Sequence, residues 1–375
     1  MSALRSPQAT LPRLLADGLP PLELPRDLVG LVRDAGLRGR GGAAFPTATK
    51  MEAVLAQHGR RVVVANGTEG EPASSKDRGL LRVAPELVLD GIAVTAAALR
   101  AKRAIVAVAH DAPELQRAAS RRRIEIVRVP GGFVAGEETA LVDTLSGGKG
   151  KPTLKPPFPF ERGVGGEPTL MQNVETFAQI ALIARFGAAW FREAGTHDAP
   201  GTALVTLKGA VARPGVHEIE LGGTLEQVVA QLGGTTTQPQ AFLVGGYFGG
   251  WVAARDAASF RLTPDTLGAG AIVAFPEGVC PIADCARVVR YLSGESAGQC
   301  GPCVFGLEAI ADGFERQDFA PLLRWTAMVK GRGACRHPDG AARFVESALT
   351  VFSDHFAHHT RHRECRLRDE QVLPL

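Results

Sequence analysis

Short apolar runs alternate with helix-like segments through the first part of this chain, and this alternation constrains the fold more than any other feature. The runs VVVA (62–65), AIVAVAH (104–110) and IEIVRVP (124–130) are rich in apolar and β-branched residues. Between them stand LVLDGIAVTAAALRA (87–101) and PELQRAASRR (113–122), which have helical patterns. Buried strands that alternate with helices indicate a parallel sheet covered on both faces. The sequence therefore predicts an α/β domain here.

A different pattern follows the linker-like stretch GTHDAPG (195–201). Residues 203–221 alternate with period two across the turn at Arg213-Pro214-Gly215, which is typical of a β-hairpin. Thr224 occupies the N-cap position of a helical segment, and from Asp284 onward the pattern is helical. A chain of 375 residues is long enough for two or three domains. We expect an α/β domain over 1–195, a β-rich module over 196–270 and a helical domain over 271–375.

Composition narrows the class of protein. The formal net charge of +3 is too small to indicate a nucleic-acid partner. No apolar run is long enough to span a membrane, and the N-terminal residues MSALRSPQATLPRLL lack the apolar core of a signal peptide. We therefore expect a cytoplasmic protein, in which structural disulfides are rare.

The six cysteines are gathered toward the C-terminal end. In a reducing compartment such clustering favours a metal or iron–sulfur site over disulfides. Cys365 lies near the end of the chain. The other five fall within 56 residues: Cys280, Cys285, Cys300, Cys303 and Cys335.

Four histidines near the end of the chain have helical spacing and precede Cys365: His355, His358, His359 and His362. Such a stripe could place a pair of imidazoles on one metal ion. No carboxylate is spaced with these histidines, which favours a solvated basic tail instead. We expect the tail.

The segment GLRGRGGAAFPTATK (36–50) concentrates glycine and positive charge. Glycine lets the backbone approach a ligand closely. Arg38, Arg40 and Lys50 would complement an anion, most plausibly a phosphate. The alternative is a basic surface turn ahead of a helix.

Two acidic segments stand where a ligand of a parallel sheet would bind. NGTEGEP (66–72) directly follows the strand VVVA, and ligands bind at the carboxyl ends of such strands. The alternative is a solvated turn. Glu137 and Glu138 open a helix, where carboxylates can also simply complement the helix dipole. Residues 146–169, rich in Gly and Pro, predict a long irregular loop, which is either functional or disordered.

Five motifs occur in the order found in the NADH-binding flavoprotein subunit of respiratory complex I, and the chain resembles that family. The same unit occurs in NAD-linked hydrogenases and formate dehydrogenases. The motifs are GRGGAAFPTATK (39–50), NGTEGEP (66–72), AGEETAL (135–141), LKPPFPF (154–160) and QNVETF (172–177). VTLKGAVARPGVHEI (205–219) is similar to the β-grasp module of that family, and ESAGQCGPCVFG (295–306) to its cluster motif.

The resemblance implies a Rossmann-like FMN-binding domain, a β-grasp (ubiquitin-like, soluble-ligand-binding) module and a C-terminal helical bundle. It also implies an FMN-dependent electron-entry subunit, an oxidoreductase of the NADH dehydrogenase type. Electrons would be exchanged between NAD(P)H and an iron–sulfur partner through FMN and a cluster, because flavin converts a two-electron hydride into single electrons. The expected partner is a ferredoxin-type electron-transfer subunit within a hetero-oligomer, with neither nucleic acid nor a membrane span.

Motif matching assigns the site residue by residue. The catalytic residues would be Glu69 and Glu138. NADH would be contacted by Phe45, Glu71, Lys155 and Phe158. A [4Fe–4S] or [3Fe–4S] cluster would be bound by Cys300, Cys303 and Cys335. FMN would be held by Gly39, Arg40, Gly41, Gly42, Lys50, Asn66, Thr68, Glu69, Phe133, Gly136, Glu137, Glu138, Asn173 and Thr176.

The sequence also departs from the family pattern. Thr68 replaces an aspartate beside the flavin, Phe133 replaces a tyrosine, and Ala53 replaces a third aromatic platform for adenine. Ala297 stands at the first cysteine position of the cluster motif and cannot bind iron. We expect an oxygen-sensitive cluster whose fourth iron is open or served by a neighbour: Ser296, Cys280 or Cys285. The alternatives are vestigial buried thiols and an NAD-independent flavoprotein that exchanges electrons with ferredoxin.

Overall fold

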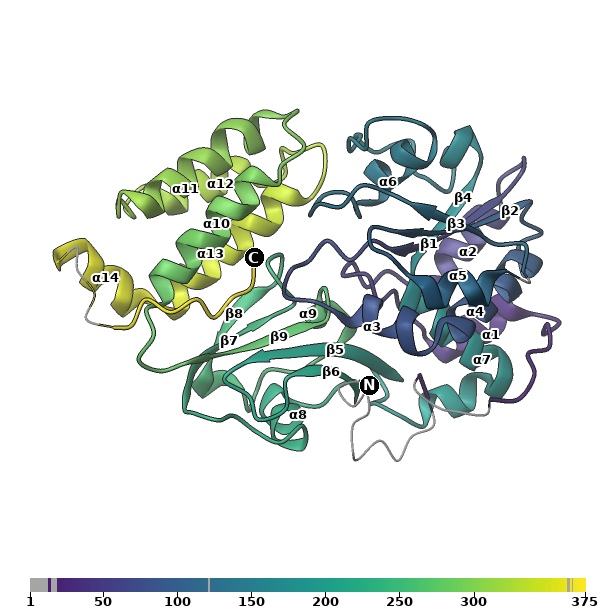
Figure 1. The fold of residues 1–375 in the computed structure, drawn as a ribbon, viewed down its shortest axis with the longest axis horizontal. Helices are drawn as coiled ribbons and strands as arrows, with labels where there is room; N and C mark the ends of the chain where they lie inside the picture. Colours follow the sequence, from purple (N-terminus) through teal and green to yellow (C-terminus); the bar gives the residue numbers. More distant parts are fainter. Residues whose placement is uncertain (1–12, 15–18, 121, 363–364, 366) are drawn as a thin grey trace.

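The chain folds into three groups of elements, seen at the right, lower centre and upper left of Figure 1. The computed structural model describes residues 13–14, 19–120, 122–362, 365 and 367–375.

The first group is built on a four-stranded, all-parallel sheet with the order β3-β2-β1-β4. This confirms the parallel α/β arrangement, although β4 was not expected from the sequence. The strands are β1 (Val62–Gly67), β2 (Arg103–Val108), β3 (Glu125–Arg128) and β4 (Thr169–Asn173). The helices are α1 (Leu28–Ala35), α2 (Thr47–Leu55), α3 (Lys76–Val83), α4 (Pro85–Ala98), α5 (Pro113–Ala119), α6 (Glu138–Leu145), the short η2 (Val164–Gly166) and α7 (Val174–Arg192).

Both faces of this sheet are buried because the strand β1 is apolar on both. Val63 and Ala65 belong to the core formed with α1, α4 and α7, whereas Val62 and Val64 belong to a second core formed with α6. Helices α4 and α7 pack closely at Gly91, where a Cβ would stand 1.8 Å from the Phe177 carbonyl oxygen. The chain returns to the other side of β1 to form β4, so the sheet reverses its order between β1 and β4. Ligands of open α/β sheets bind at such a reversal.

The second group is a five-stranded mixed sheet with the order β6-β5-β9-β7-β8. Strand β9 pairs with β5 in parallel and with β7 antiparallel, so it lies at the centre of the sheet. The boundary predicted at residue 270 is therefore wrong, because it separates β9 from its own sheet. The elements are β5 (Thr202–Gly209), β6 (Gly215–Glu220), α8 (Leu225–Gln231), β7 (Pro239–Val244), β8 (Gly250–Ala253), η3 (Ala254–Asp256), α9 (Pro264–Leu267) and β9 (Ala271–Pro276).

Local predictions for this group are confirmed. The predicted hairpin forms between β5 and β6, which pair antiparallel. Thr224 caps α8: its side chain accepts from the Gln227 backbone N–H at 3.3 Å, and Gln227 accepts from the Thr224 N–H at 3.0 Å. This reciprocal pair satisfies two backbone donors at the helix start.

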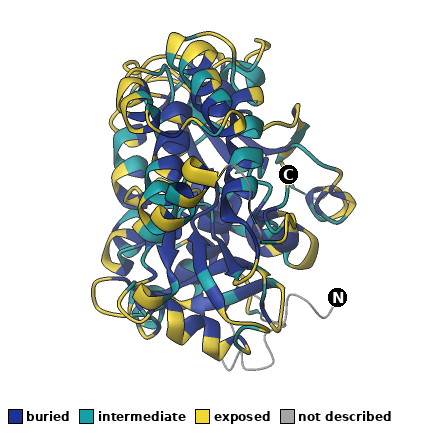
Figure 2. Cartoon of the chain, turned by 90° about the vertical axis from the view of Figure 1, so that its left-hand side faces the viewer, coloured by how far each residue is buried: buried dark blue, intermediate teal, exposed yellow. Residues whose placement is uncertain are grey.

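The third group is helical, as predicted. It packs against the second sheet through a shared apolar core, which includes Trp251 of β8 and Phe344. Figure 2 shows the buried residues, in dark blue, in the interior of the molecule. The described residues include no helix that is long and apolar enough to cross a membrane. The helices are α10 (Pro281–Gly294), the π-helical η4 (Pro302–Leu307), α11 (Glu308–Glu315), α12 (Leu322–Val329), α13 (His337–Val351) and α14 (Ser353–His362).

Candidate functional site

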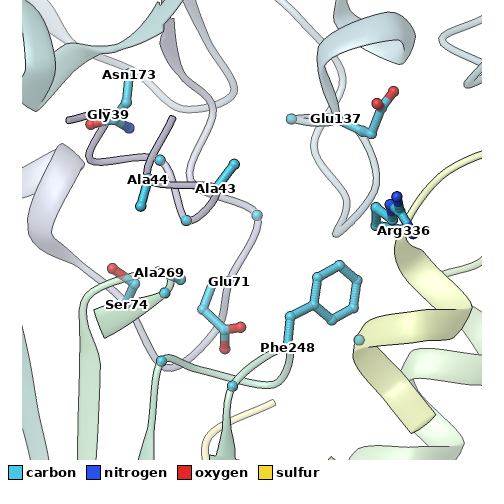
Figure 3. Close-up of a pocket in the computed structure, with 18 of the residues that line it drawn as sticks. Gly39, Ala43, Ala44, Glu71, Ser74, Glu137, Asn173, Phe248, Ala269 and Arg336 are labelled. Atoms are coloured by element: carbon cyan, nitrogen blue, oxygen red, sulfur yellow. The ribbon is translucent and has the colours of Figure 1, made fainter. Parts of the chain in front are cut away.

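A cavity of about 960 Å³ opens at the carboxyl ends of β1 and β4, where all three groups of elements meet. The first group lines it with the glycine loop (residues 39–42), the turn 66–71 and the start of α6. The second group adds the loop around Phe248 and residues 265–269, and the third adds residues around Cys335 and Arg336. Figure 3 shows Glu71, Phe248 and Arg336 around one space.

Most of the residues assigned by resemblance to FMN and NADH line this cavity. Thr176 and Phe158 are not among the lining residues. Thr176 lies behind the glycine loop, where its Oγ1 accepts from the Arg40 backbone N–H at 2.9 Å. Phe158 stacks on Phe160 with ring centroids 5.3 Å apart. Those that line the cavity are Gly39, Arg40, Gly41, Gly42, Phe45, Lys50, Asn66, Thr68, Glu69, Glu71, Phe133, Gly136, Glu137, Glu138, Lys155 and Asn173.

The glycine loop packs closely against the end of β4 and has a conformation that requires glycine. A Cβ on Gly41 would stand 3.2 Å from the Asn173 Cβ, and Gly42 has φ of +103°, a conformation that side chains disfavour. The Gly39 backbone N–H donates to the Phe45 carbonyl at 2.9 Å, which closes the loop. The Gly39 and Arg40 N–H groups are thus bonded within the protein, which leaves those of Gly41 and Gly42 as candidate donors to a phosphate.

The two arginines of the loop are engaged elsewhere, which corrects their predicted role as anion-binding charges. The Arg40 guanidinium donates to the Thr202 carbonyl at 2.9 Å and lies 3.8 Å from the Glu175 carboxylate. Arg38 donates to the Asp265 carboxylate at 2.7 Å. Both side chains hold the loop against the second sheet, and Lys50 is the remaining predicted cation.

A buried ionic network behind the loop was missed in the sequence. Lys76 donates to Asp77 at 2.6 Å and to Glu175 at 2.8 Å, and all three side chains are buried. Burial alone would lower the pKa of Lys76, but these two carboxylates outweigh it and raise the pKa. Asn173 joins the network, donating to Asp77 at 2.6 Å. The only sequence signal was the pair Lys76–Asp77 at the start of a helix, which alone indicates nothing more than a capped helix end.

Glu138 is held between two lysines at the cavity. Lys50 donates to its Oε1 and Lys155 to its Oε2, each at 2.9 Å. Burial alone would raise the pKa of Glu138, but the two ammonium groups outweigh it and hold the pKa below its ordinary value. Glu138 is therefore a carboxylate at neutral pH, and Lys50 is already paired before any phosphate arrives.

Two other predicted carboxylates cap helices. Glu69 accepts from the backbone N–H groups of Asp77 at 2.8 Å and Arg78 at 2.9 Å, at the start of α3. Glu137 accepts from the N–H groups of Thr139 at 2.8 Å and Ala140 at 3.0 Å, at the start of α6. For Glu137 the alternative, a carboxylate that complements the helix start, describes the geometry. Glu69 also lines the cavity, and the catalytic role expected of it stays a prediction.

Glu71 joins the first group of elements to the second. Its carboxylate accepts from the Tyr247 backbone N–H at 2.7 Å and from the Ala73 N–H at 3.0 Å. Burial raises the pKa of Glu71 to about 7 despite these two donors. A Cβ on Gly246 would stand 2.4 Å from this carboxylate, so the contact requires glycine there.

The three predicted cluster cysteines lie on two neighbouring segments of the helical group. Cys300 stands two residues before η4, and Cys303 is buried within it. Cys335 stands two residues before α13 and lines the cavity. Burial, and next the neighbouring Cys300, raise the pKa of the Cys303 thiol, so a metal is needed to stabilise the thiolate. π-helical turns occur frequently at functional sites. Three converging thiols of this kind fit an iron–sulfur cluster.

Two of the suggested substitutes for the missing fourth thiol are excluded by the length of α10. Cys280 immediately precedes this helix and Cys285 lies in its second turn, whereas Ala297 follows its last residue. A helix rises about 1.5 Å per residue, so even Cys285 stands about 13 Å from the helix end. Ser296, adjacent to Ala297, is the one suggested neighbour that stays close.

Aromatic rings pack between the turn around Phe133 and the segment around Cys335. Phe133 packs edge-on against Phe248, with centroids 4.7 Å apart, and against His337 at 5.7 Å. His337 follows Cys335 by two positions and is anchored at 2.7 Å to the Leu292 carbonyl. Phe248 was not identified from the sequence, because it comes from the turn between β7 and β8.

Three segments of the chain match models of known protein families. Residues 32–182 match a family model described as the Nuo51 FMN-binding domain. Residues 284–359 match the NADH-ubiquinone oxidoreductase-F iron–sulfur binding region, and residues 204–247 match the SLBB domain.

Individual relatives and solved structures agree. The chain is 30% identical over 380 residues to an F-type subunit of NADH-quinone oxidoreductase from Rhizobium meliloti, covering 91% of this chain and 90% of the relative. It is 32% identical over 383 residues to the F-type subunit of the same enzyme from Mycobacterium tuberculosis, covering 91% and 86%. An NAD⁺-reducing [NiFe]-hydrogenase in the air-oxidized state superposes with a TM-score of 0.84 at 32% identity. That match covers 92% of this chain and 64% of the hydrogenase chain.

Proposed function

This chain belongs to the family of the F-type subunits of NADH-quinone oxidoreductase, and from that premise we propose how its residues carry out the work of the family. The function is NADH-linked electron input to an iron–sulfur chain, with FMN, NADH and an iron–sulfur cluster as cofactors. One observation carries the proposal. The glycine loop and Cys335 line the same cavity, so a flavin on the loop would lie next to the cluster segment.

The glycine loop and Lys50 would hold the FMN phosphate. FMN, when bound, accepts a hydride from NADH and releases the electrons singly. The backbone N–H groups of Gly41 and Gly42 would supply donors, because those of Gly39 and Arg40 are bonded within the protein. Lys50 would supply a positive charge, which in this structure is paired with Glu138. The Glu138 carboxylate keeps its second lysine, Lys155, when Lys50 turns to the phosphate. Glu138 is thereby a partner that Lys50 can leave while the contact with Lys155 persists.

The dinucleotide would bind in the same cavity, beside the FMN site. Phe45 is 47% exposed and lines the cavity, as expected of a ring that stacks on an adenine. Lys155, which shares Glu138 with Lys50, and Arg336 place positive charge in the cavity, where a pyrophosphate would be bound. Glu71 fixes the turn 66–72 on the second sheet, and so sets the width of the cavity.

The cluster would be bound by Cys300, Cys303 and Cys335, with the iron nearest Ala297 open or bound by Ser296. Phe133, Phe248 and His337 pack together at the wall of the cavity beside Cys335, and would limit the water around the cluster. A dry, packed medium favours electron transfer over short distances and protects reduced cofactors from side reactions.

The finer architecture follows from the sheet orders. In the second sheet two adjacent parallel strands, β5 and β9, are flanked by antiparallel neighbours, and α8 crosses between β6 and β7. This order supports a β-grasp module over 196–276, between a Rossmann-like domain over 1–195 and a helical bundle over 277–375. Because its relatives are named as subunits, we propose a hetero-oligomer with an iron–sulfur electron-transfer subunit.

An anaerobic titration tests the function. The whole chain, reconstituted with FMN and cluster, is mixed stepwise with NADH while the flavin absorbance and the EPR signal of the cluster are recorded. We expect the flavin to bleach and the cluster signal to appear. If neither NADH nor NADPH bleaches the flavin while a reduced ferredoxin does, the NAD-independent alternative replaces this proposal.

A further inference from the structure

A second group of metal-binding side chains lies outside the cavity, at the outer part of the helical group. The Cys280 sulfur stands 3.3 Å from the His359 Nε2, and both side chains are buried. Cys365 completes the group, with the three ligand atoms all within 4.8 Å of one another. The cluster cysteines lie beyond the opposite end of α10, about 21 Å long, so this group is distinct from the cluster site.

The backbone around these three residues is held by regular structure. The Cys280 backbone N–H donates to the Arg368 carbonyl at 2.9 Å, and the Arg368 N–H donates to the Gly278 carbonyl at 3.1 Å. These bonds fasten the segment that contains Cys365 beside Cys280. On the other side, Phe356 of α14 packs edge-on against Phe319 with centroids 4.8 Å apart. The three ligand atoms are therefore brought together by folding before any ion binds.

The burial of His359 contradicts the solvated tail expected from the histidine stripe. His359 is only 6% exposed, whereas His358 and His362 of the same helix are exposed, as the tail predicts. The His359 Nδ1 is buried without a hydrogen-bond partner among the described residues, and the Nε2 is directed at a thiol. A buried imidazole with such weak hydrogen bonding needs an explanation beyond packing.

We propose that Cys280, His359 and Cys365 bind one Zn²⁺ ion. Two thiolates and one imidazole form a donor set that zinc prefers. Tetrahedral zinc with bonds of about 2.0–2.3 Å separates its ligand atoms by about 3.3–3.8 Å. The Cys280–His359 distance of 3.3 Å lies in this range, and the limit of 4.8 Å for the whole group requires at most a small adjustment on binding. Water or a further side chain occupies the fourth position. Binding displaces the two thiol protons to solvent, and involves no oxidation or reduction.

The position of Cys280 connects the site to the start of a helix. Cys280 is the N-cap residue of α10. Zinc at this point would fasten α14 and the C-terminal segment to the start of α10. Figure 1 shows α14 at the outer left edge, where it has few other neighbours.

Metal analysis of the whole, cluster-containing chain tests the proposal. Zinc and iron are counted separately in wild type, Cys365→Ser and Cys280→Ser, with Cys285→Ser as the matched control. Cys285 is a buried thiol on the same helix but outside the group of three ligands. We expect about one zinc per chain in wild type and in Cys285→Ser. We expect at least tenfold less in the two ligand variants, with the iron content unchanged.

Cobalt gives a second readout that does not depend on zinc carried through purification. Co²⁺ added to the zinc-depleted protein should produce thiolate-to-metal absorption that is reduced in Cys365→Ser, whose side chain is only half-buried and whose loss leaves the core intact. The proposal is overturned if wild type binds neither zinc nor cobalt. It is also overturned if mass analysis shows a Cys280–Cys365 disulfide in place of the metal, or if Cys285→Ser loses zinc equally.

Discussion

Arg40 Nε lies 3.8 Å from Glu175 Oε1, and neither side chain is exposed to solvent by more than 4%. The two residues come from the glycine loop and from the first turn of α7, so their contact fixes the loop on the helix that follows β4. An arginine that looks like a phosphate ligand in the sequence is thus a support for the loop.

This relationship predicts a difference between two arginines of the same loop. Arg40→Met leaves a buried carboxylate short of one partner, and should lower the free energy of unfolding by about 3–5 kcal/mol. Arg38→Met removes a pair whose Asp265 is 58% exposed, and should cost about 0–1 kcal/mol. Urea denaturation of the two variants measures both. Equal losses would contradict the supporting role of Arg40.

Lys50 is predicted to bind the FMN phosphate. Lys50→Met removes a charge-assisted contact of about 1.5–3 kcal/mol and should weaken FMN binding on the order of tenfold or more. Fluorescence titration of the flavin-free protein measures the dissociation constant. Lys151→Met, which removes an exposed lysine of the nearby irregular loop, is the control and should leave that constant unchanged. An unaltered FMN affinity in Lys50→Met would remove Lys50 from the phosphate site.

Glu71 is predicted to make stability depend on pH. Its pKa in the folded protein is about 7, above the ordinary 4.5, because burial disfavours the charge. The folded state therefore holds this proton more tightly than the unfolded chain does. The resulting stabilisation is complete below about pH 4.5 and is lost as the pH rises through about 7.

The variant Glu71→Gln cannot ionise, so its stability relative to wild type should improve by about 1–3 kcal/mol between pH 5 and pH 8. Urea denaturation across that range measures the difference. Glu218, a second carboxyl whose pKa burial raises to about 7, lies on β6 away from the cavity. Bound NADH should alter the pH dependence contributed by Glu71 and leave that of Glu218 as it was. A difference between Glu71→Gln and wild type that stays constant with pH would contradict the raised pKa.

The substitution Ala297→Cys is predicted to complete the cluster ligands. Wild type should hold a cluster that loses iron in air, because one iron lacks a thiolate. Ala297→Cys should hold about four irons per chain and survive air severalfold longer. Iron and sulfide analysis with anaerobic EPR measures both. If Ser296 supplies the fourth ligand, Ser296→Ala makes the wild-type cluster still more labile. A reconstituted wild type without iron, beside an iron-containing Ala297→Cys, would identify the site as a relic.

Phe45 and Phe158 are predicted to differ in NADH binding, although the motifs suggest the same role for both. Phe45 lines the cavity, whereas Phe158 stacks on Phe160 outside it. Stacking on a base contributes about 1–3 kcal/mol, so Phe45→Ala should raise the apparent Kd for NADH on the order of tenfold or more. Phe158→Ala should change it much less. Anaerobic titration of flavin bleaching measures both values, and a larger effect at Phe158 would show that the loop 146–169 closes over the dinucleotide.

Ala53 stands at the position of a third aromatic platform for adenine in the family pattern, but in the structure this position is outside the cavity. It lies on α2, where its carbonyl accepts from Gln57 at 3.3 Å, and it does not line the cavity. An aromatic side chain introduced there would have to reach beyond its own helix to meet the dinucleotide.

Patterns of a few neighbouring residues were enough to predict many of the secondary-structure elements and many of the cavity residues of this protein. The alternation of apolar runs and helices predicted the parallel sheet, and Thr224 and the hairpin turn were predicted correctly because caps and turns depend on residues within one turn of each other. The motif residues of the cavity were also found, since the carboxyl end of β1 and the glycine loop are each continuous in sequence. Strand β4 was missed because its residues TLMQN contain no β-branched run beyond Thr169.

Contacts between distant segments were decided by the tertiary structure alone. Strand β9 belongs to the second sheet because it pairs with both β5 and β7. No turn pattern in the sequence predicts this pairing. Arg40 contacts Glu175, and Cys280 contacts His359. The two residues of each pair are far apart in the chain, and no sequence pattern around either one identifies the other. The same residue types serve as ligand, cap or buried support according to what packs against them, because burial and neighbouring charge set their chemistry. Sequence spacing limits which residues can meet locally, and packing selects which distant ones do.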